Sequence, residues 1–171
     1  MDLLFCPKCR YPSTGGICPT CNIARDSPPE TYIEKLMGAI LSADPQRVGM
    51  AIDVLTKRLH EPRAIIPIAI LAGSEVDAHR LVMAARGLGW LGDRDAVPLL
   101  TDLLLNPDKP YVTRVAAAQS LGLLGGERAR AALRRASKDA RPSVRQASAQ
   151  ALQKLMEEEV MEEEVDEITH E

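Results

Sequence analysis

The four cysteines of the chain lie in one short N-terminal segment, at Cys6, Cys9, Cys18 and Cys21. Their spacing is C-x2-C-x8-C-x2-C, and each pair has the form C-P-x-C. Proline fixes φ in each half, and Gly15-Gly16 permits a turn that brings the second pair beside the first. Four converging thiolates form the closed tetrahedral site that is typical of structural Zn²⁺. We therefore predict one structural zinc ion, whose binding supplies the folding energy of a segment too short to bury a core.

Other uses of these cysteines are weaker. Two disulfides need an oxidising compartment, and the start MDLLF lacks the basic residues and long apolar run of a secretory signal. Two C-x-x-C redox pairs would need a βαβ context that is not seen here. Iron in place of zinc is the remaining competitor. The segment resembles the short zinc ribbons of many bacterial and archaeal proteins over residues 4–24 only, which implies a structural site and names no partner.

The composition indicates closely packed helices. The 171 residues are 46% hydrophobic but only 3% aromatic, so the apolar content is mostly Ala, Leu, Val and Ile. Residues beyond the cysteine segment suffice for one ordinary core. No run approaches the roughly 18 apolar residues of a membrane span. With reduced cysteines and no signal, we expect a cytoplasmic protein.

An internal repeat follows the cysteine segment. AARGLGWLGDRDAVPLL (84–100) aligns with AAQSLGLLGGERARAAL (117–133) at an offset of 33, and PSVRQASAQALQKL (142–155) echoes residues 110–124 at an offset of 31. One core position is shared by Leu55, Leu88, Leu121 and Leu152. Each unit consists of two helices, the first ending at glycine (Gly92, then Gly125-Gly126). We expect helices at about 31–42, 45–59, 63–72, 76–91, 95–105, 110–124, 127–138 and 142–156.

A two-helix unit of this length cannot bury its apolar face alone, so the units must stack. The stretches DKPYVTRVAAAQSLGLLG and DARPSVRQASAQAL resemble the HEAT repeats of the phycobilisome-lyase type, over roughly residues 44–156. The first unit is degenerate, because it lacks the glycine pair and carries Gly49 inside a helix. The resemblance implies an all-α, short right-handed α-solenoid, with second helices lining the concave face. It implies binding more than chemistry.

We find no catalytic pattern in the chain. Deoxyhypusine hydroxylases, which are HEAT-repeat enzymes, carry His-Glu pairs near the starts of first helices; here that slot holds Ala78-His79-Arg80, Thr113-Arg114 and Val144-Arg145. Bilin lyases share the repeat name, but this chain has few aromatic residues. A P-loop, a nucleophile elbow and paired carboxylates are all missing. We therefore predict that the protein is not an enzyme and has no small-molecule substrate.

Two blocks of opposite charge lie near the C-terminus. Residues 127–145 carry seven basic and two acidic side chains, whereas residues 157–171 carry nine acids and no Lys or Arg. On helix 127–138 the apolar residues fall within one arc, and a basic face opposes them: Arg128, Arg130, Arg134, Arg135 and Lys138. This face is either simply solvated or binds an acidic protein or nucleic-acid phosphates. We expect the tail to be disordered and to contact the basic face weakly within the chain.

Helix 63–72 is apolar on every side, in the stretch AIIPIAILA. Such a helix is usually covered on both sides. Helix 31–42 is a ready cover, because Ile33, Leu36, Met37, Ile40 and Leu41 share one side. A partner groove at this end of the chain is the alternative.

These patterns divide the chain into four parts: a zinc ribbon (1–25), a linker and capping helix (26–43), HEAT-like repeats (44–156) and an acidic tail (157–171). Our expectation is a non-enzymatic scaffold or adaptor that binds a protein partner, as an accessory subunit of a larger complex. The alternative is a nucleic-acid- or ribosome-associated factor that uses the ribbon and the basic groove.

Overall fold

The structure is a computed structural model that describes residues 4–5, 12–13, 32–74 and 77–169; its side chains are described for 32–74 and 77–157. Near the N-terminus, strand β1 (Leu4–Phe5) pairs antiparallel with β2 (Pro12–Ser13), with Leu4 opposite Ser13. All other described secondary-structure elements are helices, joined by short turns and loops.

Helices α1 (Tyr32–Ile40), α2 (Pro45–Asp53), α3 (Ile65–Gly73) and α4 (Ala78–Leu91) are followed by α5 (Val97–Leu105), α6 (Tyr111–Leu124), α7 (Gly126–Ala136) and α8 (Pro142–Thr169). Short turns of other helix types adjoin three of them: a π-helical turn η1 (Val54–Arg58) and the 3₁₀ turns η2 (Pro62–Ala64) and η3 (Arg94–Ala96). The predicted helices are thus all present, with bounds that differ by a few residues and a much longer last helix.

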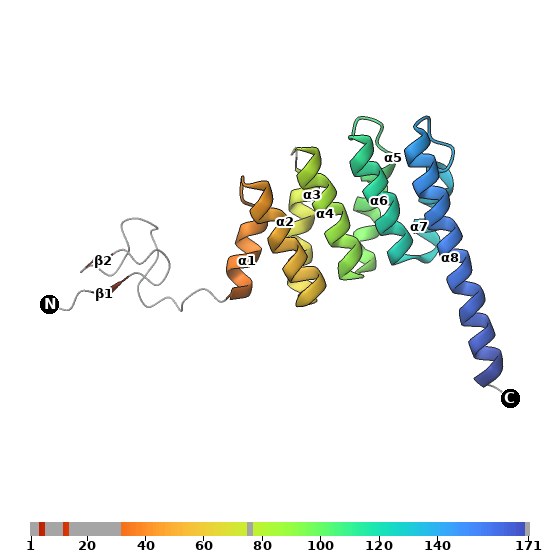
Figure 1. Cartoon of the computed structure of the whole chain (residues 1–171), viewed down its shortest axis with the longest axis horizontal. Coiled ribbons are helices and arrows are strands. Elements are labelled where there is room, and N and C mark those ends of the chain that lie inside the picture. Colours follow the sequence, from red (N-terminus) through yellow and green to blue (C-terminus); the bar gives the residue numbers. More distant parts are fainter. Residues whose placement is uncertain (1–3, 6–11, 14–31, 75–76, 170–171) are drawn as a thin grey trace.

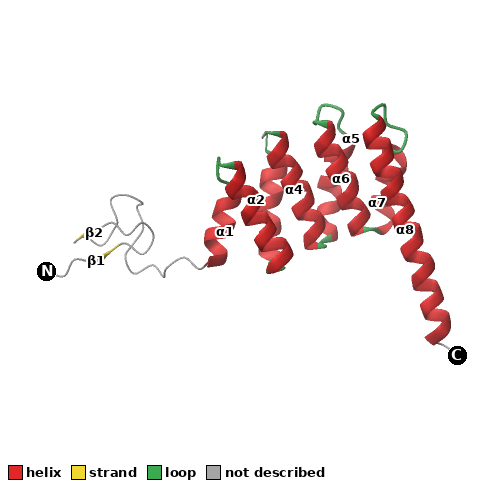
Figure 2. Ribbon diagram, viewed as in Figure 1, coloured by secondary structure: helices red, strands yellow, loops and turns green. Residues whose placement is uncertain are grey.

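The helices form two layers (Figures 1 and 2). First helices α2, α4, α6 and α8 stand side by side in one layer, and α3, α5 and α7 lie behind them. Packing is most extensive between α4 and α6 and between α6 and α8. The structure is therefore an α-solenoid of stacked helix pairs, as the repeat predicts.

Capping residues at the helix ends explain where the helices begin and end. Asp77 accepts hydrogen bonds from the amides of His79 and Arg80, which begins α4. Gly92 ends the same helix at a φ of 74°, a left-handed conformation in which glycine carries no steric penalty. Asp93 then accepts from the amide of Asp95 and begins the next turn. Asp44 caps α2 in the same way, with Pro45 in the first turn.

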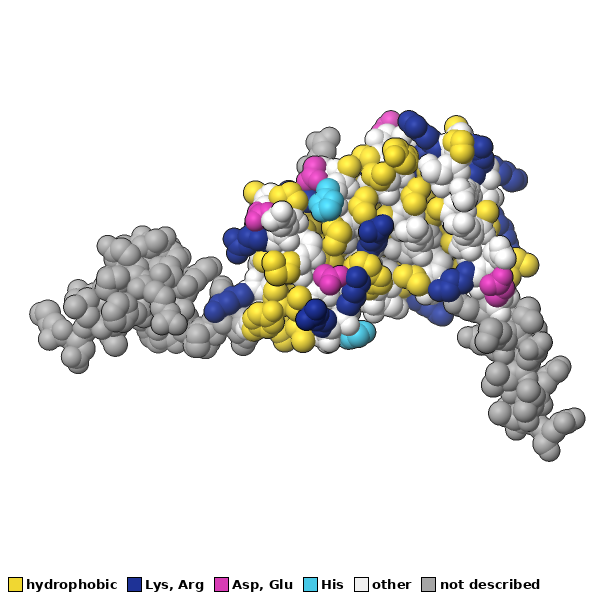
Figure 3. All heavy atoms as spheres, in the orientation of Figure 1, with side chains coloured by type: hydrophobic (Ala, Val, Ile, Leu, Met, Phe, Trp, Pro, Cys, Tyr) yellow, Lys and Arg dark blue, Asp and Glu magenta, His cyan; other side chains and the backbone are white. Residues whose placement is uncertain are grey.

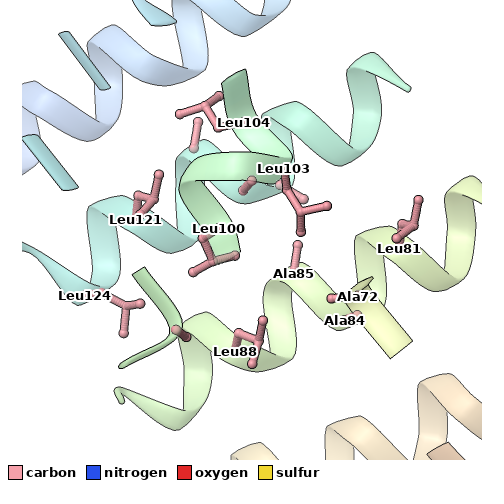
Figure 4. Close-up of a cluster of buried hydrophobic side chains, with 14 of the residues drawn as sticks. Ala72, Leu81, Ala84, Ala85, Leu88, Leu100, Leu103, Leu104, Leu121 and Leu124 are labelled. Atoms are coloured by element: carbon pink, nitrogen blue, oxygen red, sulfur yellow. The ribbon is translucent and has the colours of Figure 1, made fainter. Parts of the chain in front are cut away.

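The core lies between the two layers (Figure 4). Leu88 of α4 and Leu121 of α6 are fully buried, and so is Leu55 of η1. These are the leucines that the repeat places at one shared position. Leu152 is only partly buried, because it lies in α8, the last of the described helices, and no described helix pair packs beyond it.

Small residues set how closely the first helices approach. A Cβ added to Gly89 would lie 2.6 Å from Ser120 Oγ, and one added to Gly122 would lie 2.8 Å from Ala151 Cβ. Both distances are shorter than a van der Waals contact. The hydroxyl of Ser120 donates to the carbonyl oxygen of Ala85, 2.8 Å away, which joins α6 directly to the backbone of α4.

Three features differ from the sequence-based expectations. The helix expected over 45–59 widens into η1, where the buried Thr56 hydroxyl donates to the carbonyl oxygen of Ile52 at 2.7 Å. Helix α3 packs against α1 as expected, yet Ile66 and Ile70 remain 66% and 54% exposed. The expectation that helix α3 is covered on both sides within the chain is therefore wrong for the side that carries Ile66 and Ile70.

The third difference is the acidic tail, which was expected to be disordered. In the structure α8 continues without a break to Thr169 and extends beyond the ends of α6 and α7 (Figure 1). Residues 143–169 contain no Gly or Pro that would end the helix. The continuous helix leads away from the body (Figure 1), a path that differs from the one expected for a tail folded back on its own basic face.

Candidate functional site

The predicted zinc ligands Cys6, Cys9, Cys18 and Cys21 lie outside the described residues. The pairing of β1 with β2 bears on them indirectly, because it brings together the two ends of the segment 6–11 that holds Cys6 and Cys9. A paired hairpin of this kind is compatible with the turn that a C-P-x-C half requires. The zinc site stays a prediction.

Helix α7 separates its faces as the sequence predicts. The apolar arc is buried, with Leu133 and Ala129 both fully covered. On the basic face Arg130 is half-buried, whereas Arg128, Arg134, Arg135 and Lys138 are exposed. Arg134 makes a long, exposed ion pair with Glu127 at 3.4 Å. The basic face thus exists as a surface, and its role in binding stays a prediction.

A pocket of about 400 Å³ lies between α5 and α7. It is lined by Val97, Pro98, Thr101, Asp102 and Leu105 of α5 and by Arg128, Ala131, Ala132 and Arg135 of α7. Its floor is apolar, while two arginines and one aspartate stand at the rim. The sequence identified the arginines but not the floor, since α5 had no recognised role.

A second pocket, of about 520 Å³, opens on the first-helix layer. It is lined by Ala78, His79, Val82 and Arg86 of α4, by Tyr111, Val112 and Val115 of α6, and by Ser143 of α8. Three successive first helices therefore contribute to one concavity near their N-terminal ends. We name these eight residues the first-helix pocket.

The first-helix pocket is apolar with cationic and hydroxyl groups at its edge. Among the described residues no acid lines it, whereas Arg86 and His79 both do. Tyr111 and Val112 are 48% and 38% exposed, although large apolar side chains are normally buried. Arg141 lies over the Tyr111 ring at 5.5 Å from its centroid. Figure 3 shows this side of the molecule, where apolar side chains gather over α4 and α6.

Other exposed apolar groups extend this surface toward the opposite helix ends. Leu123 is 50% exposed beside a smaller pocket of about 260 Å³ between α6 and α8. Trp90 occupies the equivalent position on α4, and the Lys57 ammonium lies 3.8 Å from its ring centroid. We name the exposed side of α4, α6 and α8 the first-helix face.

Three arginines position the helices that form the first-helix pocket: Arg114 is buried, Arg80 is half-buried and Arg145 is exposed. Arg114, at the start of α6, donates from Nε to the carbonyl oxygen of Leu104 at 2.8 Å and from Nη2 to the carboxylate of Asp139. Arg145, at the start of α8, donates to the carbonyl oxygens of Asp139 and Ala140. Arg80 of α4 likewise donates to the carbonyl oxygen of Ser42 at 2.8 Å.

Asp139 is the anionic centre of this network. Burial alone would raise the pKa of Asp139. Hydrogen bonds from the Arg141 amide and from Arg114, with the positive charges of Arg114 and Arg145, outweigh burial and hold that pKa below its ordinary value. Asp139 is therefore a stable carboxylate that fixes the starts of α6 and α8 relative to one another.

Comparison with known repeats agrees with this geometry. Residues 108–163 match the model for HEAT repeats, and residues 81–106 match the model for the PBS lyase HEAT-like repeat. The body of the chain carries HEAT-like repeats. No curated protein matches the sequence.

Two solved structures show what the fold resembles. Human deoxyhypusine hydroxylase is 22% identical, with a TM-score of 0.62 over 75% of this chain and 44% of that one. The chain thus spans less than half of the hydroxylase, and the likeness shows the fold alone. The second is the complex of CpcE and CpcF of phycocyanin lyase from Nostoc sp. PCC7120, which is 25% identical, with a TM-score of 0.55 over 81% of this chain and 70% of that one.

These similar structures correct one prediction. We expected no enzymatic role, yet both similar structures are of enzymes, a hydroxylase and a lyase, and one matched repeat model is itself of the lyase type. The prediction of no enzymatic role is therefore withdrawn, because the lyase complex, at 25% identity, and the matched lyase-type repeat model speak against it. The prediction of no small-molecule substrate also lacks support, since the first-helix pocket has the volume of ordinary ligand pockets.

Two further findings concern the described part of the chain. It holds no group of three or more His, Cys, Asp or Glu side chains placed to bind a metal ion. None of its helices combines the length and apolar character needed to cross a membrane.

Proposed function

We propose that this HEAT-repeat chain works in an enzyme system that acts on a protein, and that its first-helix face binds that protein. The observation that carries the proposal is the first-helix pocket, in which three successive first helices present exposed Tyr111 and Val112 beside Arg86 and His79. Exposed aromatic and aliphatic side chains next to arginine are typical of the centre of protein interfaces.

The rigidity of the pocket supports this role. Its walls are held by hydrogen bonds between buried or half-buried groups, including those of Arg114 and Arg80, rather than by loops. A preformed site loses less conformational entropy on binding than a mobile one. An apolar side chain of the partner would enter the pocket, with a carboxylate near Arg86.

The similar lyase supports a protein partner as well. Its structure is of a complex of two chains, CpcE and CpcF, and this chain aligns with one of them over most of its length. We propose that this chain likewise acts with a second protein. A small molecule that shares the pocket with the bound protein is compatible with its volume.

The cysteine segment completes the proposal. Cys6, Cys9, Cys18 and Cys21 would hold one Zn²⁺ as a closed thiolate site. Bound zinc would supply folding energy to this segment and no reaction step. Support comes from the ligand spacing and from the β1–β2 pairing around the first two cysteines.

Site-specific photocross-linking in the native cell tests the binding face. A photoreactive residue at position 112 should cross-link to one defined protein, identified by mass spectrometry. The same residue at position 66 is the control, because Ile66 is likewise apolar and is even more exposed than Val112, at 66% against 38%, but lies on the outer side of α3. Val112→Asp should then abolish binding of the identified protein without unfolding the chain. Equal capture at both positions, or binding unchanged by Val112→Asp, would contradict the proposal.

A further inference from the structure

The groove between α5 and α7 carries positive charge that no described side chain neutralises. Arg128 and Arg135 line it from α7, both exposed, and neither has an ion pair with any residue of the described chain. The two residues are seven apart, so they stand about 10 Å from each other along one side of the helix. Asp102 is the single acid among the lining residues, so the groove remains net positive.

The floor of the same groove is apolar. Val97 is almost fully buried from α5, Ala132 is almost fully buried from α7, and Leu105 is half-buried. A ligand that matches the groove must therefore combine negative charge with an apolar stripe. A simple polyanion would satisfy the arginines and leave the floor uncovered.

The C-terminal part of α8 has both properties. Residues 157–171 carry nine acids and no basic Lys or Arg, and Met161, Val165 and Ile168 recur at i, i+4 and i+7. On a helix this spacing gives one apolar stripe among acidic positions. Acids three and four residues apart repel one another, so this helix gains stability when a cationic surface lies against it.

Geometry prevents α8 from reaching the groove of its own chain. The helix has 28 residues, whereas α6 and α7 have 14 and 11. At about 1.5 Å per residue, residues 157–169 extend about 20 Å beyond the packed part. Figure 1 shows this segment leading away from the body. A return to α7 would require a break in a stretch that has no Gly or Pro.

We propose that the acidic end of α8, residues 157–169, binds in the α5–α7 groove of a second copy of this chain. Its carboxylates face Arg128 and Arg135 while its apolar stripe covers the groove floor. The contact is small, so the association is weak and depends on concentration and salt. A reciprocal exchange, in which each copy supplies one tail and one groove, doubles the contact and gives a closed dimer.

Sedimentation of the full-length protein tests this inference. The chain should associate at about 0.01 M salt, where the Debye length is about 30 Å, and dissociate at about 1 M, where it is about 3 Å. Arg128→Glu with Arg135→Glu should lower the association constant about tenfold or more, since two attractive exposed charges become repulsive. Arg47→Glu with Arg58→Glu is the charge-matched control on α2 and η1, and it should associate like the unchanged protein.

Charge reversal of the tail tests directly whether the tail and the groove bind each other. A variant with Glu158, Glu159, Glu162 and Glu163 all changed to Lys should also fail to associate alone. Mixed with the Arg128→Glu/Arg135→Glu variant, it should form a mixed dimer, because opposite charges are again paired. Recovery on mixing also shows that both variants are folded.

Three results would overturn the inference. The first is a protein that stays monomeric at low salt over the whole concentration range. The second is association that is unaffected by reversal of Arg128 and Arg135. The third is a monomer whose shape changes with salt in a tail-dependent way, because the tail would then bind its own chain.

Discussion

Gly89→Ala is expected to destabilise the solenoid at its centre. The added Cβ would lie 2.6 Å from Ser120 Oγ, 2.7 Å from Ser120 Cβ and 2.9 Å from Ser120 Cα. Carbon atoms in contact are normally about 3.5–4.0 Å apart. Since one of these atoms is backbone, a side-chain rotation cannot relieve the overlap, and α4 and α6 must separate.

The expected size follows from three contributions. Overpacking of a filled core costs about 1–3 kcal/mol. Separation of the helices also strains the Ser120 hydrogen bond to Ala85, which is worth about 1 kcal/mol. Alanine is favoured over glycine within a helix by about 1 kcal/mol, which acts in the opposite direction. We expect the free energy of unfolding to fall by about 2 kcal/mol.

Urea unfolding followed by circular dichroism measures this change. With a urea dependence of about 2 kcal/mol per M, the midpoint should fall by about 1 M. Gly38→Ala is the matched control, because Gly38 lies exposed in α1 and no described atom would lie within 4 Å of its new Cβ. That variant should be equally or more stable. If Gly89→Ala also proves as stable as the unchanged protein, the close α4–α6 approach is wrong.

Three further outcomes are expected. Leu121→Ala should lower the free energy of unfolding by roughly 2–5 kcal/mol, because the Leu121 side chain is fully buried. Leu152→Ala should lower it less, because that side chain is only partly buried. Equal losses in urea unfolding would contradict this difference in burial. Asp139 has a lowered pKa in the folded chain, so its stabilising effect is complete above the pKa of an unfolded aspartate, about 3.9, and disappears as the pH falls through the lower folded value. Asp139→Asn should therefore be less stable at neutral pH and lose less stability between neutral and acid pH than the unchanged chain, and a parallel loss would argue against the Arg114 pairing. Elemental analysis should find one zinc per chain, and Cys9→Ser should lose it while the helical signal of the repeats persists; near-stoichiometric iron, or two disulfides, would refute the zinc assignment.

The helix pairs and their stacking could be predicted from the amino-acid sequence, because the signals that begin and end these helices act over a few residues. Asp77 and Gly92 limit α4 through hydrogen bonds and dihedral angles that neighbouring residues supply. The leucine at the repeated position also identified the core, since one two-helix unit must bury the same face as the next. The separation of faces on α7 follows from helical periodicity and was predicted, although Arg130 is half-buried and Lys138 lies beyond the end of the helix.

The positions of the candidate binding surfaces follow only from the packing of the helices. The first-helix pocket joins residues from Ala78 to Ser143, and its volume depends on how closely α4, α6 and α8 approach at Gly89 and Gly122. The exposure of Ile66 and Ile70 likewise depends on which helices stack beside α3, which an apolar stretch cannot indicate. The density of negative charge suggested a disordered tail. In the structure the tail is the end of α8, whose packed N-terminal half nucleates the helix, so that each further residue only has to extend it. Local sequence specifies the helices, because the contacts that begin and end them lie within a few residues. Pockets and exposed patches arise between segments that are distant in the sequence, so their shape and exposure depend on how the helices pack.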